Sequence, residues 1–462
     1  MSPPLLADAP LPWYWTTLQR VVAVQKKEWR GVLVAFIALF CLFTGYASLR
    51  PMRDSMGITL GTKQLGGLFG WTFAGTLTAM PLFGWLASRL PRRIFLPALY
   101  GFFILTLLGF YALLAGAPQR LLGARLFFVW VSVVNLFIVS AFWTLMADLY
   151  KSEQSRRLFG CIAAGSSAGS IVGPALTALL VKSVGDANML LLAAGFWSAA
   201  VVLIIYRLRP ERRDAEPRRS ASTAAQPGPP SVGPEPAADP AERPLGGNPF
   251  AGIALVGKSP YLLGISVFVL LLSATTTFLY LQQAALLSQA IPLPADRTRL
   301  LATLDTAVNV VSLLLQLFVV GRLTARVGGA VVLFSVPALM VAGFLVLSLA
   351  PALAVLLGVM LVRRVGEYAL LRPSREILFT SVDRPTKYKA KSFIDTVVYR
   401  GADWLNAKLH DLLVALGMST SGVALSGAAV AAVWALVGLT LGRWHMSSRA
   451  AEPLKKSPPP PS

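Results

Sequence analysis

The sequence feature that most constrains the fold is a series of long apolar stretches. A helix needs roughly 20 mainly apolar residues to cross a lipid bilayer. Twelve stretches of suitable length lie at 31–50, 66–88, 94–116, 125–147, 158–181, 187–206, 261–283, 299–320, 329–350, 353–374, 390–416 and 420–441. We therefore predict an all-α polytopic membrane protein with twelve transmembrane helices.

The amino-acid composition excludes several other classes of protein. The chain is 55% hydrophobic and only 14% charged, whereas a soluble domain is about 25% charged and 45–50% apolar. Its two cysteines, Cys41 and Cys161, lie within apolar stretches and predict no disulfide framework. Residues 1–30 lack the features of a signal peptide. An ordinary soluble enzyme, a disordered regulator and a secreted disulfide scaffold are thus excluded.

The charge distribution predicts the sidedness of the helices. A net charge of +21 would suggest a nucleic-acid partner in a soluble protein, but membrane proteins concentrate Lys and Arg in their cytoplasmic loops. If both termini are cytoplasmic, about 30 of the 42 Lys and Arg residues lie on the inner side. We therefore expect cytoplasmic termini, a bacterial inner membrane as the location, the lipid bilayer as a partner and no nucleic acid.

The chain divides into two halves that resemble each other. Residues 207–257 are rich in Pro, Ala, Arg and Glu, and we expect a disordered cytoplasmic linker there. Residues 84–93 and 321–328 share Gly, Leu and Arg at an offset of 237, and Arg157 and Phe159 correspond to Lys391 and Phe393 at an offset of 234. We therefore expect six-helix pseudo-repeats at 31–206 and 258–443, between an N-terminal segment at 1–30 and a tail at 444–462.

Two of these segments resemble those of major-facilitator transporters. Residues 84–93 resemble the loop between the second and third helices of that family, with Ser88 in place of its Asp and Pro91 in place of its Gly. The fifth span, with Gly165, Gly169, Gly173 and Pro174, resembles the glycine-proline helix of the antiporter branch, although close helix packing alone would explain that spacing. The resemblance implies alternating access around a site between the two halves.

Ionisable residues within the spans are the main site candidates, because each costs at least about 2.5–3.5 kcal/mol at the bilayer centre. The first half has few: Arg50, Arg53 and Asp54 lie together near the outer end of the first span. The second half has more. Glu367 can pair with one of Arg363 and Arg364, and we expect the other arginine to remain as a surplus positive charge.

These residues form the predicted site, in which cations outnumber anions and so favour an anionic small-molecule substrate. The predicted substrate-binding residues are Arg50, Arg53, Arg363, Arg364, Lys389, Lys391 and Arg400. The predicted coupling or charge-pair residues are Asp54, Asp305, Glu367, Asp395 and Asp403. The predicted cavity-lining residues are Asn135, Trp143, Thr276, Tyr280, Gln282, Asn309, Tyr368 and Tyr399. An interhelical salt-bridge network that only stabilises the bundle is the alternative interpretation.

A second resemblance links 363–403 to the ATP/ADP translocases of plastids and intracellular bacteria. The matching segments are Arg364-x-x-Glu-Tyr-Ala-Leu-Leu-Arg-Pro-x-Arg-Glu376, Lys387-x-Lys-Ala-Lys-x-x-Ile-Asp395 and Leu49-Arg-x-x-Arg-Asp54. Glu367 and Arg372 stand where that family has Lys and Asp, and Arg53 stands where it has Lys. The resemblance implies exchange of nucleotides, and these departures leave another anionic substrate equally open.

The leading hypothesis is a secondary transporter of an organic anion or a nucleotide-like, phosphorylated solute. One alternative is a proton-coupled transporter of a neutral or cationic solute, with Asp305 as the proton carrier. An alternative of another class is a membrane scaffold or receptor. An enzyme is disfavoured, because the sequence has no Cys/His metal cluster and no phosphate-binding Gly-rich loop. We accordingly expect no metal and no cofactor.

Overall fold

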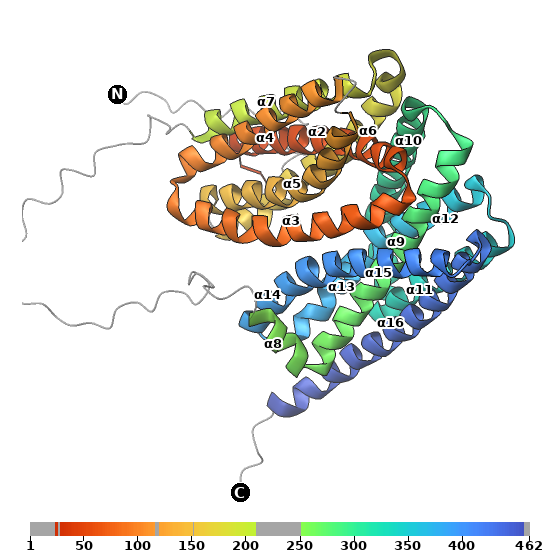
Figure 1. The fold of residues 1–462 in the computed structure, drawn as a ribbon. Helices are drawn as coiled ribbons and strands as arrows, with labels where there is room; N and C mark the ends of the chain where they lie inside the picture. Colours follow the sequence, from red (N-terminus) through yellow and green to blue (C-terminus); the bar gives the residue numbers. More distant parts are fainter. Residues whose placement is uncertain (1–23, 26–27, 116–119, 151, 209–250, 457–462) are drawn as a thin grey trace, which may run out of the picture.

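The computed structural model describes residues 24–25, 28–115, 120–150, 152–208 and 251–456, and nearly all of them are helical (Figure 1). The first half contains α2 (Trp29–Leu60), α3 (Thr62–Arg89), α4 (Arg92–Ala115), α5 (Arg120–Leu149), α6 (Ser152–Val184) and α7 (Asp186–Leu208). The second half begins with α8 (Ala251–Lys258), α9 (Pro260–Ala290), α10 (Pro294–Leu315), η2 (Gln316–Val320), α11 (Gly321–Leu349) and α12 (Leu353–Gly366). It continues with η3 (Glu367–Leu371), α13 (Arg372–Leu378), η4 (Phe379–Ser381), α14 (Arg384–Phe393), η5 (Ile394–Val398), α15 (Tyr399–Ala415) and α16 (Thr420–Lys456).

The predicted all-α polytopic fold is confirmed. Within the described ranges, nine helices are long and apolar enough to cross a membrane. The other three predicted spans fall on α3 and on the helical runs α12–η3–α13 and α14–η5–α15. The last two runs carry the charged residues on which the site prediction depends, which lowers their hydropathy. The structure therefore accommodates the predicted twelve spans.

The first span is longer than the predicted 31–50. Helix α2 continues through Pro51 to Leu60, because a proline within a membrane helix is tolerated where neighbouring helices satisfy the freed backbone groups. Arg50, Arg53 and Asp54 consequently lie well inside a helix and not at its outer end.

Helices α2 and α6 pack together unusually closely. A Cβ atom placed on Gly165, Gly169 or Gly173 would lie 2.5 Å from a carbonyl oxygen of α2. Glycine is needed at these positions because it lets two backbones approach. The glycine spacing that resembles the antiporter helix is thus explained by packing.

The helices form two bundles, α2–α7 and α8–α16; in Figure 1 the first lies above most of the second, and α10 of the second bundle rises beside α6. One apolar core lies mainly in the first bundle and extends to Leu281, Leu301 and Ala407 of the second, and another core lies within the second bundle. Between the bundles, α10 packs against α6 and α2, and α15 packs against α3. At the end where α2 finishes, Ser55 donates a hydrogen bond to the carbonyl of Pro294 at 3.0 Å, and Lys182 pairs with Asp296 at 2.5 Å. The bundles are therefore joined at the end opposite α8 and α14.

The segments expected to be disordered differ in part from the structure. Helix α7 continues to Leu208, and α8 forms within the last part of the expected linker at 207–257. Helix α8 has a packing partner in α14, because a Cβ on Gly252 would lie 2.5 Å from the side chain of Phe393. Helix α16 likewise continues to Lys456, into the expected tail. The rest of the linker (209–250), residues 1–23 and residues 457–462 lie outside the described residues.

Candidate functional site

Five arginines from three helical segments gather with four carboxylates where the two bundles face each other. We call the following residues the arginine cluster: Arg50, Arg53, Arg363, Arg364 and Arg400. Four of the five make ion pairs: Arg53 with Asp54 at 2.6 Å, Arg363 with Glu367 at 2.9 Å, Arg364 with Asp305 at 2.5 Å and Arg400 with Asp403 at 3.6 Å. The fifth arginine is therefore the exception.

Arg50 is the cation without an acidic partner. Among the residues that the structure describes, no carboxylate oxygen lies within 4.0 Å of its guanidinium. The side chain is half-buried and interacts electrostatically with Asp305 and Tyr368 of the other bundle. The expectation that Arg363 or Arg364 carries the surplus charge is wrong, since Asp305 comes from α10 to neutralise Arg364. The surplus charge lies in the first bundle instead.

Helix α2 contributes a charge pair that also contacts the second bundle. Arg53 donates from Nε and Nη2 to Asp54 Oδ1, at 2.9 and 2.6 Å. Tyr280 of α9 donates its hydroxyl hydrogen to the same oxygen at 3.0 Å. The Arg53 guanidinium also lies 5.3 Å from the ring centre of Phe128. Asp54 is thus a shared acceptor that joins α2 to α9.

The α12–η3 segment carries two buried ion pairs in adjacent positions. Arg363 donates to Glu367 at 2.9 Å and to the Thr276 hydroxyl at 2.8 Å. Arg364 points to Asp305 on α10. The three charged side chains on this segment, Arg363, Arg364 and Glu367, are each at most 9% exposed. Burial of unpaired charge is costly, so these pairs also fix how α12 packs against α9 and α10.

Tyr368 lies between three arginines. Its phenol interacts electrostatically with Arg50, Arg364 and Arg372, and the Arg372 guanidinium lies 4.3 Å from its ring centre. The π-helical segment η3 contains Tyr368, and Gln316 donates to its backbone carbonyl at 2.9 Å. Wide π-helical turns are frequent at functional sites. Positive charge is thus concentrated around a half-buried phenol that can donate a hydrogen bond.

Helix α15 brings Arg400 and Asp403 together, three residues apart as their spacing predicts. Asp403 Oδ1 accepts a hydrogen bond from the Ser273 hydroxyl of α9 at 2.6 Å. Arg400 donates to the backbone carbonyl of Ser132, in the other bundle, at 3.5 Å. Asp395, another of the predicted charge-pair residues, does not pair with Arg400: it lies one helical turn earlier and pairs with Arg375 at 3.1 Å.

The predicted lysines lie on α14, away from the arginine cluster. Lys391 pairs with Glu376 at 2.5 Å. Lys389 is half-buried where α14 meets α8. Arg372, 60% exposed at its side chain, also lies 3.6 Å from Glu367. Arg372 therefore connects the buried pairs with the accessible surface.

The predicted cavity-lining residues fall into three groups. Thr276, Tyr280, Tyr368 and Tyr399 contact or adjoin the arginine cluster. Asn309 joins the bundles instead, by donating to the Ser170 carbonyl at 2.7 Å. Gln282 does not line the site: it is 3% exposed and donates to the carbonyl of Thr420, the first residue of α16, at 3.5 Å.

Two predicted lining residues of the first bundle lie on α5 without a described polar contact to the cluster. Trp143 packs against Phe159, with ring centres 5.2 Å apart, and Asn135 is half-buried. Sequence reasoning missed Ser132, which accepts a hydrogen bond from Arg53, and Ser273, which donates one to Asp403. Nothing in the sequence distinguishes them, because serine in a helix commonly bonds to its own backbone.

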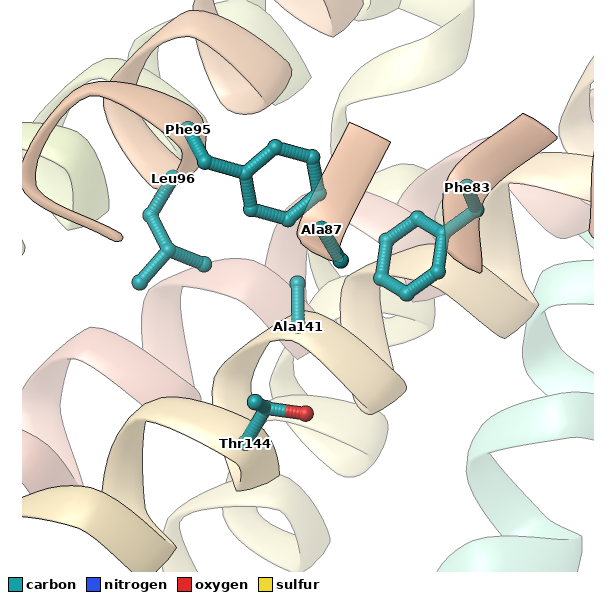
Figure 2. A pocket seen from close by; sticks show the side chains of 6 residues that line it. All are labelled: Phe83, Ala87, Phe95, Leu96, Ala141 and Thr144. Carbon is teal, nitrogen blue, oxygen red and sulfur yellow. The ribbon is translucent and has the colours of Figure 1, made fainter. Parts of the chain in front are cut away.

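A small apolar pocket lies elsewhere, within the first bundle. Its volume is about 80 Å³, and Figure 2 shows the six side chains that line it: Phe83, Ala87, Phe95, Leu96, Ala141 and Thr144. None of the predicted site residues lines this pocket. It is apolar and offers only the Thr144 hydroxyl as a polar group, so the arginine cluster is the better candidate site for a charged ligand.

The chemistry that the cluster supports is the binding of an anionic group. Arginine forks suit carboxylate and phosphate oxygens. Among the described residues, no group of three or more His, Cys, Asp and Glu side chains could bind a metal ion.

Comparisons with known proteins give a family and a fold. The profile described as Major Facilitator Superfamily matches residues 35–374. No curated protein shows significant similarity to the chain.

Solved structures of transporters share the fold at low sequence identity. The nucleoside transporter NupG is 12% identical, with a TM-score of 0.57 over 90% of this chain and 98% of that one. A bacterial homolog of the human lysosomal transporter Spinster, inward-facing and unoccupied, is 15% identical, with a TM-score of 0.56 over 95% of this chain and 100% of that one. The POT family transporter PepTSo is 16% identical, with a TM-score of 0.61 over 90% of this chain and 98% of that one.

Proposed function

The chain belongs to the Major Facilitator Superfamily, and on that premise we propose that it is a secondary transporter that moves an organic anion by alternating access. The substrate class is an organic anion with a phosphate or carboxylate group, and a nucleotide-like solute fits best. The binding site is the arginine cluster, and Arg50 is the residue that recognises the negative charge.

The observation that carries this proposal is that no carboxylate of the described residues forms an ion pair with Arg50. Each other arginine of the cluster is neutralised by a carboxylate. A cation without a counter-ion is costly inside a membrane protein, and an anionic substrate supplies the missing charge. A network built only for stability would not need a fifth, unneutralised arginine.

The nucleotide-like character rests on two further points. The segments around Arg50, Arg364 and Asp395 resemble those of the ATP/ADP translocases, and a solved structure with this fold is a nucleoside transporter. Tyr280, Tyr368 and Tyr399 adjoin the cluster and can stack on a planar base.

We further propose that the site in this structure is accessible from the cytoplasm. The described contacts between bundles lie at mid-helix or towards the end where α2 finishes and α10 begins. The bias of Lys and Arg places the opposite end, which carries α8 and α14, in the cytoplasm, along with both termini. The expected location is a bacterial inner membrane.

The test is counterflow in proteoliposomes, in which unlabelled solute inside drives uptake of the same labelled solute. The solutes are adenosine monophosphate, adenosine diphosphate, ribose phosphate and succinate. Replacing Arg50 by Gln should reduce apparent affinity for the transported solute about 10- to 100-fold, the loss expected for one charged hydrogen-bonded contact. Arg50→Lys should recover part of it, because lysine restores the charge but not the fork.

Thermal stability separates binding from a structural role. Because Arg50 has no acidic partner to strand, Arg50→Gln should melt no lower than the wild-type protein. Arg299→Gln is the matched control, since Arg299 is exposed and its side chain makes no ion pair or hydrogen bond among the described residues, and it should leave transport unchanged. Full transport of every solute by Arg50→Gln would refute the assignment, and a wild-type protein that moves none of them would refute the substrate class.

A further inference from the structure

The pair between Arg400 and Asp403 differs from the other three pairs of the cluster. Its nitrogen and oxygen are 3.6 Å apart, beyond hydrogen-bond distance, while the others are 2.5–2.9 Å apart. Arg400 is also the only paired arginine of the cluster with a described hydrogen bond to the opposite bundle, through the Ser132 carbonyl. Its side chain is 22% exposed. The Arg400 guanidinium is therefore the one best able to change partners.

The two oxygens of Asp403 have different surroundings. Oδ1 accepts the 2.6 Å hydrogen bond from Ser273, and the Asn406 amide lies behind that serine, 3.4 Å from its oxygen. Oδ2 faces Arg400 and has no hydrogen bond among the described residues. A proton on Oδ2 would leave the Ser273 bond intact, so the site can accommodate Asp403 as a carboxylate or as a carboxylic acid.

The other groups around Asp403 leave Arg400 as its main source of positive charge. Arg363 of α12 and Glu367 of η3 both interact electrostatically with Asp403. Because they carry opposite charges and form an ion pair with each other, their effects on Asp403 offset each other. Tyr399 of the same helix adds no positive charge. Ser273 of α9 is a neutral donor, and the α3 side chain nearest to Gly401 is Phe73. Departure of Arg400 would therefore leave a buried carboxylate without a counter-ion.

We propose that Asp403 is the proton-binding residue of the transporter and that Arg400 couples the proton to the anion. This inference rests on the proposed function and adds the coupling ion to it. When the anion binds, Arg400 turns from Oδ2 to the anion. Oδ2 then takes a proton from a hydronium ion that reaches the site from solvent: one O–H bond of the hydronium breaks, a new O–H bond forms on Oδ2, and a water molecule is released. One proton and one negative charge enter together, so a monoanionic group leaves the charge of the site unchanged.

The alternative carrier, Asp305, fits this role less well. Its Oδ1 makes a 2.5 Å pair with Arg364, which is 7% exposed. A proton would have to displace an arginine that has little access to water and no described partner in the other bundle. The geometry thus favours Asp403 over Asp305.

Infrared difference spectroscopy on the full chain in lipid tests the proposal through the carbonyl stretch of a protonated carboxylic acid. Adding inorganic phosphate at neutral pH should produce this band in the wild-type protein, and Asp403→Asn should abolish it. Arg400→Gln should show the band before phosphate is added. Asp411→Asn, on the same helix but one residue beyond His410 and outside the cluster, is the control and should keep the phosphate-induced band.

Two outcomes overturn the proposal, and the first of them does not depend on the substrate. One is an ionised Asp403 in Arg400→Gln at neutral pH, and the other is a phosphate-induced band that survives in Asp403→Asn. A band in Arg400→Gln without any phosphate-induced band in the wild type would refute the coupling. If no anion is transported but Arg400→Gln shows the band, the proposed substrate class fails and the proton site stands.

A transport measurement gives a second readout. A proton gradient directed into the proteoliposomes, with the lower pH outside, should accelerate uptake of the transported anion by the wild-type protein. Asp403→Asn should lose this acceleration, because its side chain cannot take up a proton. Acceleration by the gradient in Asp403→Asn equal to that of the wild type would overturn the proposal.

Discussion

In each bundle the first span packs against the fifth, but the contact is apolar and close in the first bundle and polar in the second. In the first bundle, α2 and α6 meet through Gly165, Gly169 and Gly173, with backbones in near contact. In the second bundle, the corresponding helices α9 and α15 meet through Ser273, Asp403 and Asn406, which are linked by hydrogen bonds. One interface depends on shape and the other on polar groups.

This difference assigns separate tasks to the two bundles. Close glycine packing has one favourable arrangement and resists displacement. A polar contact can be rearranged by a proton or a ligand, because both alter the charges that hold it. Within the described residues, the first bundle brings only Arg50, Arg53 and Asp54 to the cluster, and the remaining cluster charges belong to the second bundle. We infer that the second bundle responds to the ligand and that the first provides a firm surface.

The largest effect should come from breaking a buried pair of the second bundle. Replacing Arg364 by Gln leaves Asp305 buried without its cation and should lower the free energy of unfolding by about 3–5 kcal/mol. The measurement is SDS titration of the purified protein in detergent micelles. The double variant Arg364→Gln with Asp305→Asn should regain most of this loss. If the single variant is as stable as wild type, the pair has no structural role.

A smaller effect is expected from disturbing the glycine contact of the first bundle. Replacing Gly169 by Ala puts a methyl group 2.5 Å from the Phe40 carbonyl oxygen, and such overpacking costs about 1–3 kcal/mol. Gly160→Ala is the control on the same helix, because a Cβ there meets nothing within 4 Å. Equal stability of the two variants would show that α2 and α6 separate easily, against the comparison drawn above.

The smallest effect concerns an ion pair of the first bundle outside the membrane. Glu28 accepts hydrogen bonds from Gln154 and Arg157, each at 2.9 Å. Burial raises the pKa of Glu28, but these bonds outweigh it and place the pKa below the ordinary 4.5. The contribution to stability is thus present above about pH 4.5 and is lost as the pH falls through the lowered value.

Replacing Glu28 by Gln should therefore cost under about 1 kcal/mol at neutral pH, as expected for a partly exposed pair. The difference from the wild type should vanish in acid. Melting temperatures of both proteins at a series of pH values check this, and a gap that widens on acidification contradicts it.

The sequence predicted the helices because the bilayer demands long apolar segments, and it predicted pairs that are close along one helix. Arg363 with Glu367 and Arg400 with Asp403 follow from helical spacing. Ion pairs between different helices could not be predicted from the sequence. Arg364 with Asp305 depends on how α10 packs against α12, and Asp395 could equally have faced Arg400 until the structure placed Arg375 nearer. The site of the surplus charge, Arg50, emerges only after all cross-helix pairs are known.

The unneutralised Arg50 also has an electrical consequence. In an alternating-access carrier, the site is at the potential of whichever side it faces, so its surplus positive charge crosses the voltage whenever the empty carrier turns over. Moving one elementary charge through 100 mV is worth about 2.3 kcal/mol. An interior-negative membrane would therefore hold the empty carrier facing inward. Because a monoanion enters together with one proton, the loaded carrier keeps the same surplus charge and has the same preference. The resting voltage would thus set how long the empty carrier waits on the inner side.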